Sequence, residues 1–177
     1  MFRQMKKILI VFLLFVSLLP TCLFAFSNVD EYKLAINAVK SASPDIALLH
    51  FLTVINETKK TKHYKDSLFA AGEYYFIIGN YNESFRILTR LIKEYPTAKE
   101  KPLALLYLMK ISRKSGHEEL AKQISREILN AQQFILLFRD TKEYSYKSPF
   151  AIKYKIIYHI DRAEFYVDGE LSEQLYY

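Results

Sequence analysis

Small residues recur along the middle of the chain at a fixed spacing of 37 positions. The best example is the series Ala47, Ser84 and Ala121, and apolar residues recur at the same interval. A fixed period of this kind is typical of proteins built from repeated structural units. Within each unit the apolar residues follow the 3.6-residue period of an amphipathic helix in two successive stretches. The pattern therefore predicts three helical hairpins over residues 28–132.

Turn-forming residues separate the two helices of each expected hairpin. Gly79 is suited to end a helix, and Gly116 stands one period later. Ser43 followed by Pro44 is typical of a helix start, because the N–H that proline lacks would have no helical partner there. Small residues such as Ser84 let the two helices of one hairpin approach closely. These features indicate antiparallel helices joined by tight turns.

Seven residues of the second unit have the spacing of a known repeat signature: Gly72, Tyr75, Gly79, Tyr81, Ser84, Leu91 and Pro96. On these positions the chain resembles the tetratricopeptide repeat (TPR) family, although Ser84 replaces the usual alanine. The run from Phe85 to Pro96, and a spacing of 37 in place of 34, are similar to the family's periplasmic branch, found in outer-membrane assembly and Tol–Pal-associated proteins. The resemblance covers residues 28–132 and implies a right-handed solenoid.

The repeat period ends after Gln133, so residues 133–177 are expected to form a C-terminal capping region. Ser148 and Pro149 have the pattern of a helix start, and an apolar stripe at helical spacing follows them. The alternative is a β-hairpin, because apolar residues alternate with polar ones from Ile152 to Ile160. The fold class expected here is all-α, a right-handed solenoid with a C-terminal capping helix, and the C-terminal β-hairpin remains the alternative.

The first 27 residues have the features of a secretory signal. Arg3, Lys6 and Lys7 precede a run from Ile8 to Leu19 that is apolar except for one serine. This run is shorter than the roughly 20 residues that span a bilayer. Cys22 offers a second interpretation, in which the mature chain begins with a lipidated cysteine, and an uncleaved anchor is a third. The sequence predicts export to the periplasm or cell envelope, with membrane association through the N-terminus as an alternative.

Composition and charge argue against several classes of function. The formal net charge is +6, but without the three basic residues of the first segment, 22 basic and 19 acidic residues remain. No Lys/Arg block alternates with aromatic residues as in a nucleic-acid groove. Cys22 is the single cysteine, which excludes a disulfide framework and a thiolate zinc site. The histidines lack helical i,i+4 partners, and no glycine loop suits a phosphate. We therefore expect no nucleic acid, no metal, no cofactor and no enzymatic activity.

In the TPR family, the first helix of each hairpin lines a concave groove that binds a protein or peptide. The resemblance assigns this groove to Tyr32, Ile36, Phe69, Glu73, Phe76, Leu106, Lys110, Arg113 and Lys114. Such a groove is apolar at its N-terminal end and basic at its C-terminal end, which suits a peptide with an acidic flank. The resemblance thus implies an exported scaffold or adaptor in cell-envelope assembly or maintenance. The alternative is a membrane-associated structural subunit that oligomerises through its tyrosine-rich C-terminal region.

Overall fold

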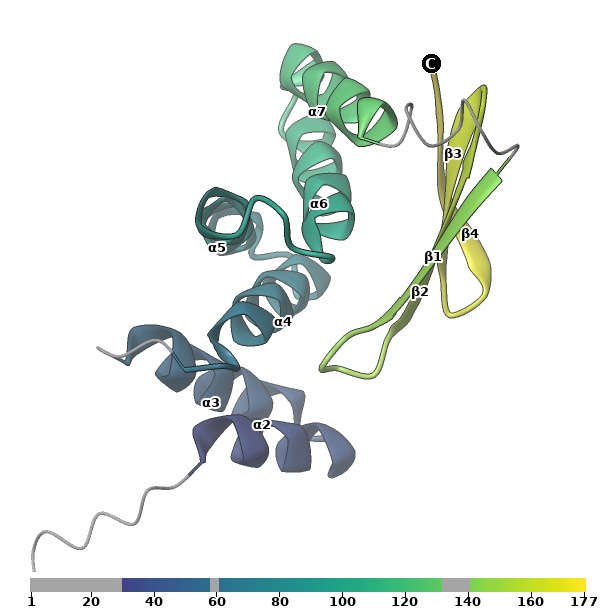
Figure 1. Cartoon of the computed structure of the whole chain (residues 1–177). Helices are drawn as coiled ribbons and strands as arrows, with labels where there is room; N and C mark the ends of the chain where they lie inside the picture. The colour runs from purple at the N-terminus through teal and green to yellow at the C-terminus, as the bar shows by residue number, and fades with distance from the viewer. Residues whose placement is uncertain (1–29, 58–60, 132–140) are drawn as a thin grey trace, which may run out of the picture. The chain divides into compact units, whose positions relative to one another are not determined.

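The computed structural model describes residues 30–57, 61–131 and 141–177 (Figure 1). The helices are α2 (Glu31–Lys40), α3 (Pro44–Asn56), α4 (Tyr64–Ile77), α5 (Tyr81–Glu94), α6 (Lys101–Lys114) and α7 (Glu118–Asn130). The strands are β1 (Thr141–Lys147), β2 (Lys153–His159), β3 (Arg162–Val167) and β4 (Glu170–Tyr176). All belong to one compact unit, Glu31–Tyr177. The expected signal segment 1–27, with Cys22, lies outside the described residues.

The helices form three successive hairpins, α2–α3, α4–α5 and α6–α7, and each hairpin also contacts the next one (Figure 1). The helices expected within residues 28–132 are therefore present. In the part of the chain that the structure describes, no helix is both long enough and apolar enough to cross a membrane.

The turn within each hairpin repeats the same backbone geometry at the 37-residue period. The second residue after each first helix has a positive φ, 53° at Ala42, 79° at Gly79 and 75° at Gly116. The N–H of the next residue then bonds to the carbonyl five positions back, at 2.8 to 2.9 Å. This is the bond of a Schellman helix end, for which glycine is preferred because it has no Cβ to clash. The first turn uses alanine instead, in a conformation that strains an L-residue.

The small residues of the repeat lie where two helices of a hairpin approach most closely. Ala47, Ser84 and Ala121 are fully or almost fully buried. The Ser84 hydroxyl donates to the carbonyl of Gly72 on the facing helix at 2.8 Å. A Cβ added at Gly72 would lie 2.5 Å from the side chain of Leu88, closer than real contacts allow. The serine is therefore compatible with burial, because its hydroxyl has a backbone partner.

The C-terminal region is a four-stranded antiparallel sheet in the order β1-β2-β3-β4. The expected all-α fold with a C-terminal capping helix is therefore wrong, and the protein combines helices with a sheet. The alternating pattern identified the correct secondary structure, but the sheet is larger than a single hairpin. Its β3–β4 turn is at Asp168 and Gly169, which both have positive φ, 49° and 94°.

Burial explains why residues 153–159 form a strand rather than a helix. Tyr154, Ile156 and Tyr158 are buried, whereas the residues between them are partly exposed. A strand places such alternate residues on one face, whereas a helix would distribute them around its circumference. Ile160, which the helical stripe would have buried, is 74% exposed at the bend after β2. One face of the sheet thus supplies apolar surface for the helices.

Candidate binding site

The sheet covers the middle of the face on which the groove was expected. The expected groove residues are on the first helices of the three hairpins, with Tyr32 and Ile36 on α2, Phe69, Glu73 and Phe76 on α4, and Leu106, Lys110, Arg113 and Lys114 on α6. Among them Phe69, Glu73 and Leu106 are at most 2% exposed. Phe69 and Leu106 share one hydrophobic core with residues of β2, β3 and β4. In this structure the centre of the face is an internal interface.

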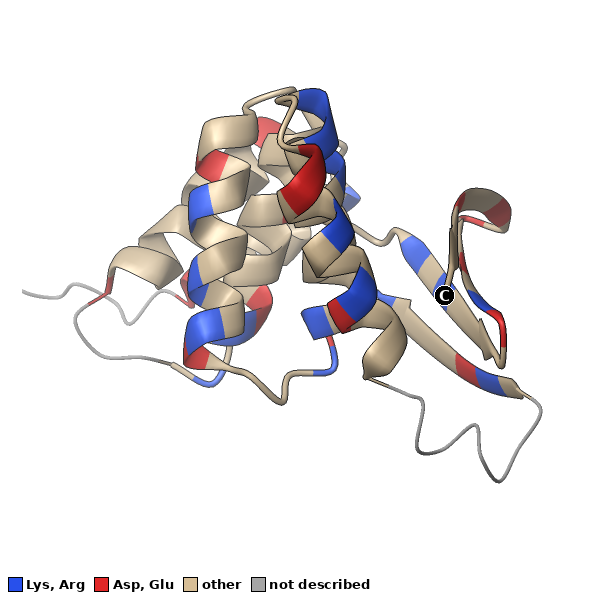
Figure 2. Cartoon of the chain, turned by 90° about the horizontal axis from the view of Figure 1, so that it is seen from above, with Lys and Arg blue, Asp and Glu red and all other residues tan. Residues whose placement is uncertain are grey.

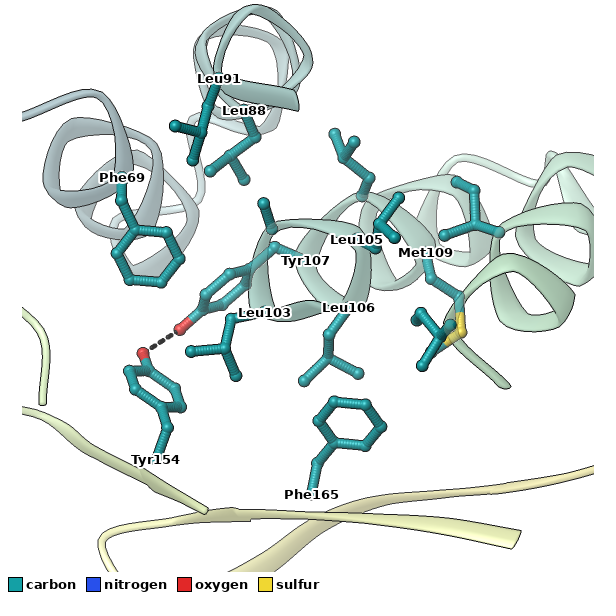
Figure 3. Close-up of a cluster of buried hydrophobic side chains, with 14 of the residues drawn as sticks. Phe69, Leu88, Leu91, Leu103, Leu105, Leu106, Tyr107, Met109, Tyr154 and Phe165 are labelled. Atoms are coloured by element: carbon teal, nitrogen blue, oxygen red, sulfur yellow. Dashed lines mark hydrogen bonds between the residues drawn. The ribbon is translucent and has the colours of Figure 1, made fainter. Parts of the chain in front are cut away.

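The apolar part of this interface is built from aromatic contacts. The ring of Phe69 lies 5.4 Å from that of Tyr146 on β1 and 6.2 Å from that of Tyr154 on β2, both edge to face. Figure 3 shows Phe165 pointing from the sheet toward Leu106 on α6. Edge-to-face pairs of this kind add to the free energy gained by burying the rings. The sheet is therefore held by the same forces as the helical core.

A buried carboxyl group lies at the centre of the interface. The Tyr154 hydroxyl donates to Oε1 of Glu73, and the hydroxyls of Tyr154 and Tyr107 are 2.5 Å apart (Figure 3). No described residue hydrogen-bonds to Oε2 of Glu73. Burial raises the pKa of Glu73 to about 7, because the ionised carboxylate loses its hydration. A protonated Glu73 is neutral in this apolar site, and the hydroxyl network links α4, α6 and β2.

The basic end of the expected groove is occupied by β4. The Lys110 ammonium donates to the hydroxyl of Ser172 at 2.8 Å, and the Arg113 guanidinium donates to the carboxylate of Glu173 at 2.8 Å. Burial lowers the pKa of Lys110. Lys114 points elsewhere, with its ammonium 5.6 Å from the centre of the Tyr81 ring. Lys110 and Arg113, which were expected to meet an acidic partner, thus have Glu173 of the same chain beside them.

Phe76 is half-buried at the edge of the interface. Its ring centre lies 4.7 Å from that of Tyr107 and 5.5 Å from that of Tyr81. It packs against the main core rather than standing free on the surface. The side chain therefore helps to hold α4, α5 and α6 together.

The N-terminal end of the expected groove remains open. A pocket of about 390 Å³ lies between α2 and the turn that joins β1 to β2. Its lining residues come from distant parts of the chain: Tyr32, Ile36, Val39, Lys40, Asp66, Lys99, Tyr146, Lys147, Ser148, Pro149 and Ala151. We call this the α2 pocket. Of the expected groove residues, Tyr32 and Ile36 line it.

The walls of the α2 pocket are held by aromatic packing. The Tyr32 ring stacks on His63 at 4.0 Å, and burial together with the nearby carboxylate of Asp66 raises the Tyr32 pKa to about 12. In the β1–β2 turn, Phe150 lies between two lining residues, Pro149 and Ala151, and its ring stacks on Tyr74 at 5.0 Å and meets Phe51 edge to face at 5.5 Å. These contacts fix the pocket in shape, so that a ligand would meet a preformed surface.

The charge around the α2 pocket is predominantly positive. Lys40, Lys99 and Lys147 line it and are exposed, and Asp66 is the acidic residue among the lining side chains. Within the described part of the chain these three lysines have no carboxylate within ion-pair distance, although Lys99 lies 5.3 Å from the centre of the Tyr146 ring. Like charges held close together attract anions. The pocket can therefore bind an apolar group that carries a negative charge next to it.

The sequence did not identify these lysines, because they are on three separate elements. Interpreting residues 141–159 as strands would have placed Lys147 beside a turn. That position is the one feature of the sequence that pointed toward Lys147. Across residues 30–57, 61–131 and 141–177, no group of three or more metal-ligating side chains comes together. A scan against protein-family models finds no match, and a search of curated proteins finds none at a significant level.

Proposed function

We propose that the protein is an exported adaptor, built from TPR-like hairpins, that binds a protein partner through the α2 pocket. The observation that carries this proposal is the combination of an apolar wall, formed by Tyr32 and Ile36, with three neighbouring lysines. The partner would present an extended segment in which an apolar residue stands next to Asp or Glu. The apolar side chain would occupy the pocket, and the carboxylate would approach the lysines.

Export remains part of this proposal. Its support is the basic and apolar pattern of residues 1–27, with cleavage after Ser27, lipidation at Cys22 or an uncleaved anchor as the three routes. The mass of the protein recovered from its own cells separates the routes. A mature chain that begins near Asn28 supports soluble export to the periplasm, and a lipid on Cys22 supports an anchored adaptor in the cell envelope.

The alternative function, oligomerisation through the tyrosine-rich C-terminal region, has less support. Tyr154 and Tyr158 are buried in the core that the sheet shares with the helices, and Tyr144 and Tyr146 pack against it. Most of the aromatic surface of β1 and β2 is therefore used within one chain.

Peptide selection provides a direct test of the α2 pocket. Random peptides displayed on phage are selected against the immobilised protein and then compared on two charge-reversed variants. The first variant combines Lys40→Glu with Lys147→Glu. The control combines Lys93→Glu with Arg126→Glu, which are exposed residues outside the pocket, so that both variants change the net charge equally. Selected peptides should be enriched in an apolar residue beside Asp or Glu.

The binding constants distinguish the possible outcomes. The pocket variant should bind the selected peptides at least about tenfold more weakly than the wild type, and the control should bind them nearly as well. Affinity for the wild type should also fall with added salt, because these charges are exposed. Selected peptides without acidic residues, or equal binding to both variants, would contradict the proposal.

A further inference from the structure

A second and larger hollow lies on a different part of the helical layer. Its volume is about 710 Å³, and it is bounded by the start of α5, the end of α6 and the start of α7. Its lining residues are Tyr81, Asn82, Phe85, Ile111, Ser112, Ser115, Gly116, His117, Glu118, Glu119 and Leu120. We call it the α5–α7 hollow. Two of the expected groove residues contact Tyr81, which lines the hollow: Lys114 lies over its ring, and Phe76 packs against it.

The repeat explains why the hollow exists between the second and third hairpins. One period earlier, the positions of Ile111, Ser112 and Ser115 are occupied by Tyr74, Tyr75 and Ile78. Tyr74 and Tyr75 pack against the core between the first two hairpins, and the Tyr74 hydroxyl donates to Asp45 at 2.7 Å. Ile111 and Ser112 are smaller than Tyr74 and Tyr75, so they fill less of the equivalent space, whereas Ile78 is itself 50% exposed. The hollow is thus a local departure from an otherwise repeated packing.

Apolar side chains are exposed in the hollow. Phe85 and Leu120 remain 36% and 37% exposed, although each lies beside the buried Ile111. The hydroxyl of Ser112 already donates to the carbonyl of Leu108 at 2.8 Å, so it does not require a ligand. Exposed apolar surface inside a concave site is typical of surfaces that bind another protein. The free energy of binding would come from covering Phe85 and Leu120.

The charge on one rim favours a basic partner. Glu118 and Glu119 form the first turn of α7, which is coloured red in Figure 2. Glu119 pairs with Lys122 at 2.9 Å on the exposed side of the helix. Glu118 has no cation within ion-pair distance among the described residues. The opposite rim carries Lys114, so the negative charge is concentrated on the α7 side of the hollow.

From these observations we infer that the α5–α7 hollow binds a short segment of another protein that inserts an aromatic or aliphatic side chain next to Lys or Arg. The apolar side chain covers Phe85 and Leu120, and the cation lies beside Glu118. This site is separate from the α2 pocket and opposite to it in charge preference. The adaptor therefore has two surfaces for two chemically different partners.

Two fluorescent peptides test this inference. Both carry Phe and Leu at the same positions. All other positions are Lys in one peptide and Glu in the other. Fluorescence anisotropy measures their binding to the full chain and to three variants. Ser115→Ile fills the hollow with the side chain found one period earlier, and Glu118→Lys reverses its rim. Glu143→Lys, on exposed β1, is the matched charge control.

We expect the Lys peptide to bind the wild type at least about tenfold more tightly than the Glu peptide. Ser115→Ile and Glu118→Lys should each weaken the Lys peptide at least about fivefold, and Glu143→Lys should not. Circular dichroism confirms that each variant is folded. Absence of binding, equal binding of both peptides, or an unchanged affinity in Ser115→Ile would overturn the inference. Loss of binding in the Lys40→Glu, Lys147→Glu variant would instead assign the peptide to the α2 pocket.

Discussion

The two ends of the expected groove differ in what lies against them. At the C-terminal end, Lys110 and Arg113 interact with β4 of the same chain, and Glu73 is sealed beneath β2. At the N-terminal end, Lys40 and Lys147 surround an open pocket, and neither has a carboxylate in ion-pair distance among the described residues. The difference teaches that one part of the surface of a helical repeat can be buried as core while another part stays exposed. Which of the two a given part becomes depends on what the rest of the chain places against it.

The largest expected effect tests whether the covered end is truly part of the core. Phe165 is 1% exposed, and Phe165→Ala should lower the free energy of unfolding by about 3–5 kcal/mol, because it leaves a cavity between sheet and helices. Tyr166→Ala on the neighbouring, partly exposed position should cost about 1 kcal/mol or less. Urea unfolding of both variants measures the difference. Similar small effects would mean that the sheet is only loosely attached.

The buried Glu73 should make the stability of the covered end depend on pH. Its pKa is about 7 in the folded protein and near 4.5 when exposed, so the folded state holds a proton that the unfolded state releases between these values. The stabilisation of the folded state by this bound proton is complete below about pH 4.5. It is lost as the pH rises to about 7, which lowers the free energy of unfolding by about 3 kcal/mol. Above about pH 7, Glu73 should cause no further change in the free energy of unfolding.

The variant Glu73→Gln isolates this contribution, because an amide does not ionise. The free energy of unfolding of wild type and variant is measured with urea at about pH 5 and about pH 8. Subtracting the change in the variant from the change in the wild type removes the contribution of the other titrating groups. The wild type should lose stability relative to the variant as the pH rises. A constant difference between the two proteins across this range would show that Glu73 does not control the pH dependence.

A medium effect on stability is expected from Phe150, whose ring packs near the open N-terminal end of the expected groove. Phe150 packs between Tyr74 and Phe51, and it is only partly buried, so Phe150→Ala should cost about 2 kcal/mol. It should also weaken peptide binding to the α2 pocket, since the β1–β2 turn forms one wall. Ile160→Ala, at a site that is 74% exposed, is the control and should change neither quantity. Unfolding and peptide titration on the same samples provide both measurements.

The smallest effect compares the cations at the two ends. Arg113→Ala removes the pair with Glu173, but Arg113 is 40% exposed, so solvent screening limits the cost to less than about 1 kcal/mol. Lys40→Ala should leave thermal stability unchanged within error. If Lys40→Ala were the more destabilising of the two, the open end would depend on its lysines for folding, and the contrast between the ends would disappear.

Much of the helical layer could be predicted from the sequence because its signals are local. The spacing of Ala47, Ser84 and Ala121 indicated where helices approach, and Gly79 and Gly116 indicated where they end. Ala42 performs the same role without a glycine, so the first turn was less evident. Such features act within about five residues or between the two helices of a hairpin, and they therefore leave a readable pattern.

The candidate site was predicted less well, because its central residues have contacts that are remote in sequence. Glu73 was assigned to a groove on its helical position, and the residue that covers it, Tyr154, is 81 positions away. The Lys99 and Lys147 of the α2 pocket belong to a loop and a strand end that had no role in the expected groove. Tyr32 and Ile36 line the α2 pocket, and whether they bind a partner remains a prediction.

The sequence by itself determined the repeated hairpins, their turns and the alternation of apolar residues near the C-terminus. Only the tertiary structure decided whether that alternation became a helix or a sheet, and which part of the expected groove stayed open. The physical reason is that residues 152–160 fit both periods, so their local preferences do not choose between them. Burying Tyr154, Ile156 and Tyr158 against the helices favours the strand, and that free energy exists only when the distant surfaces meet.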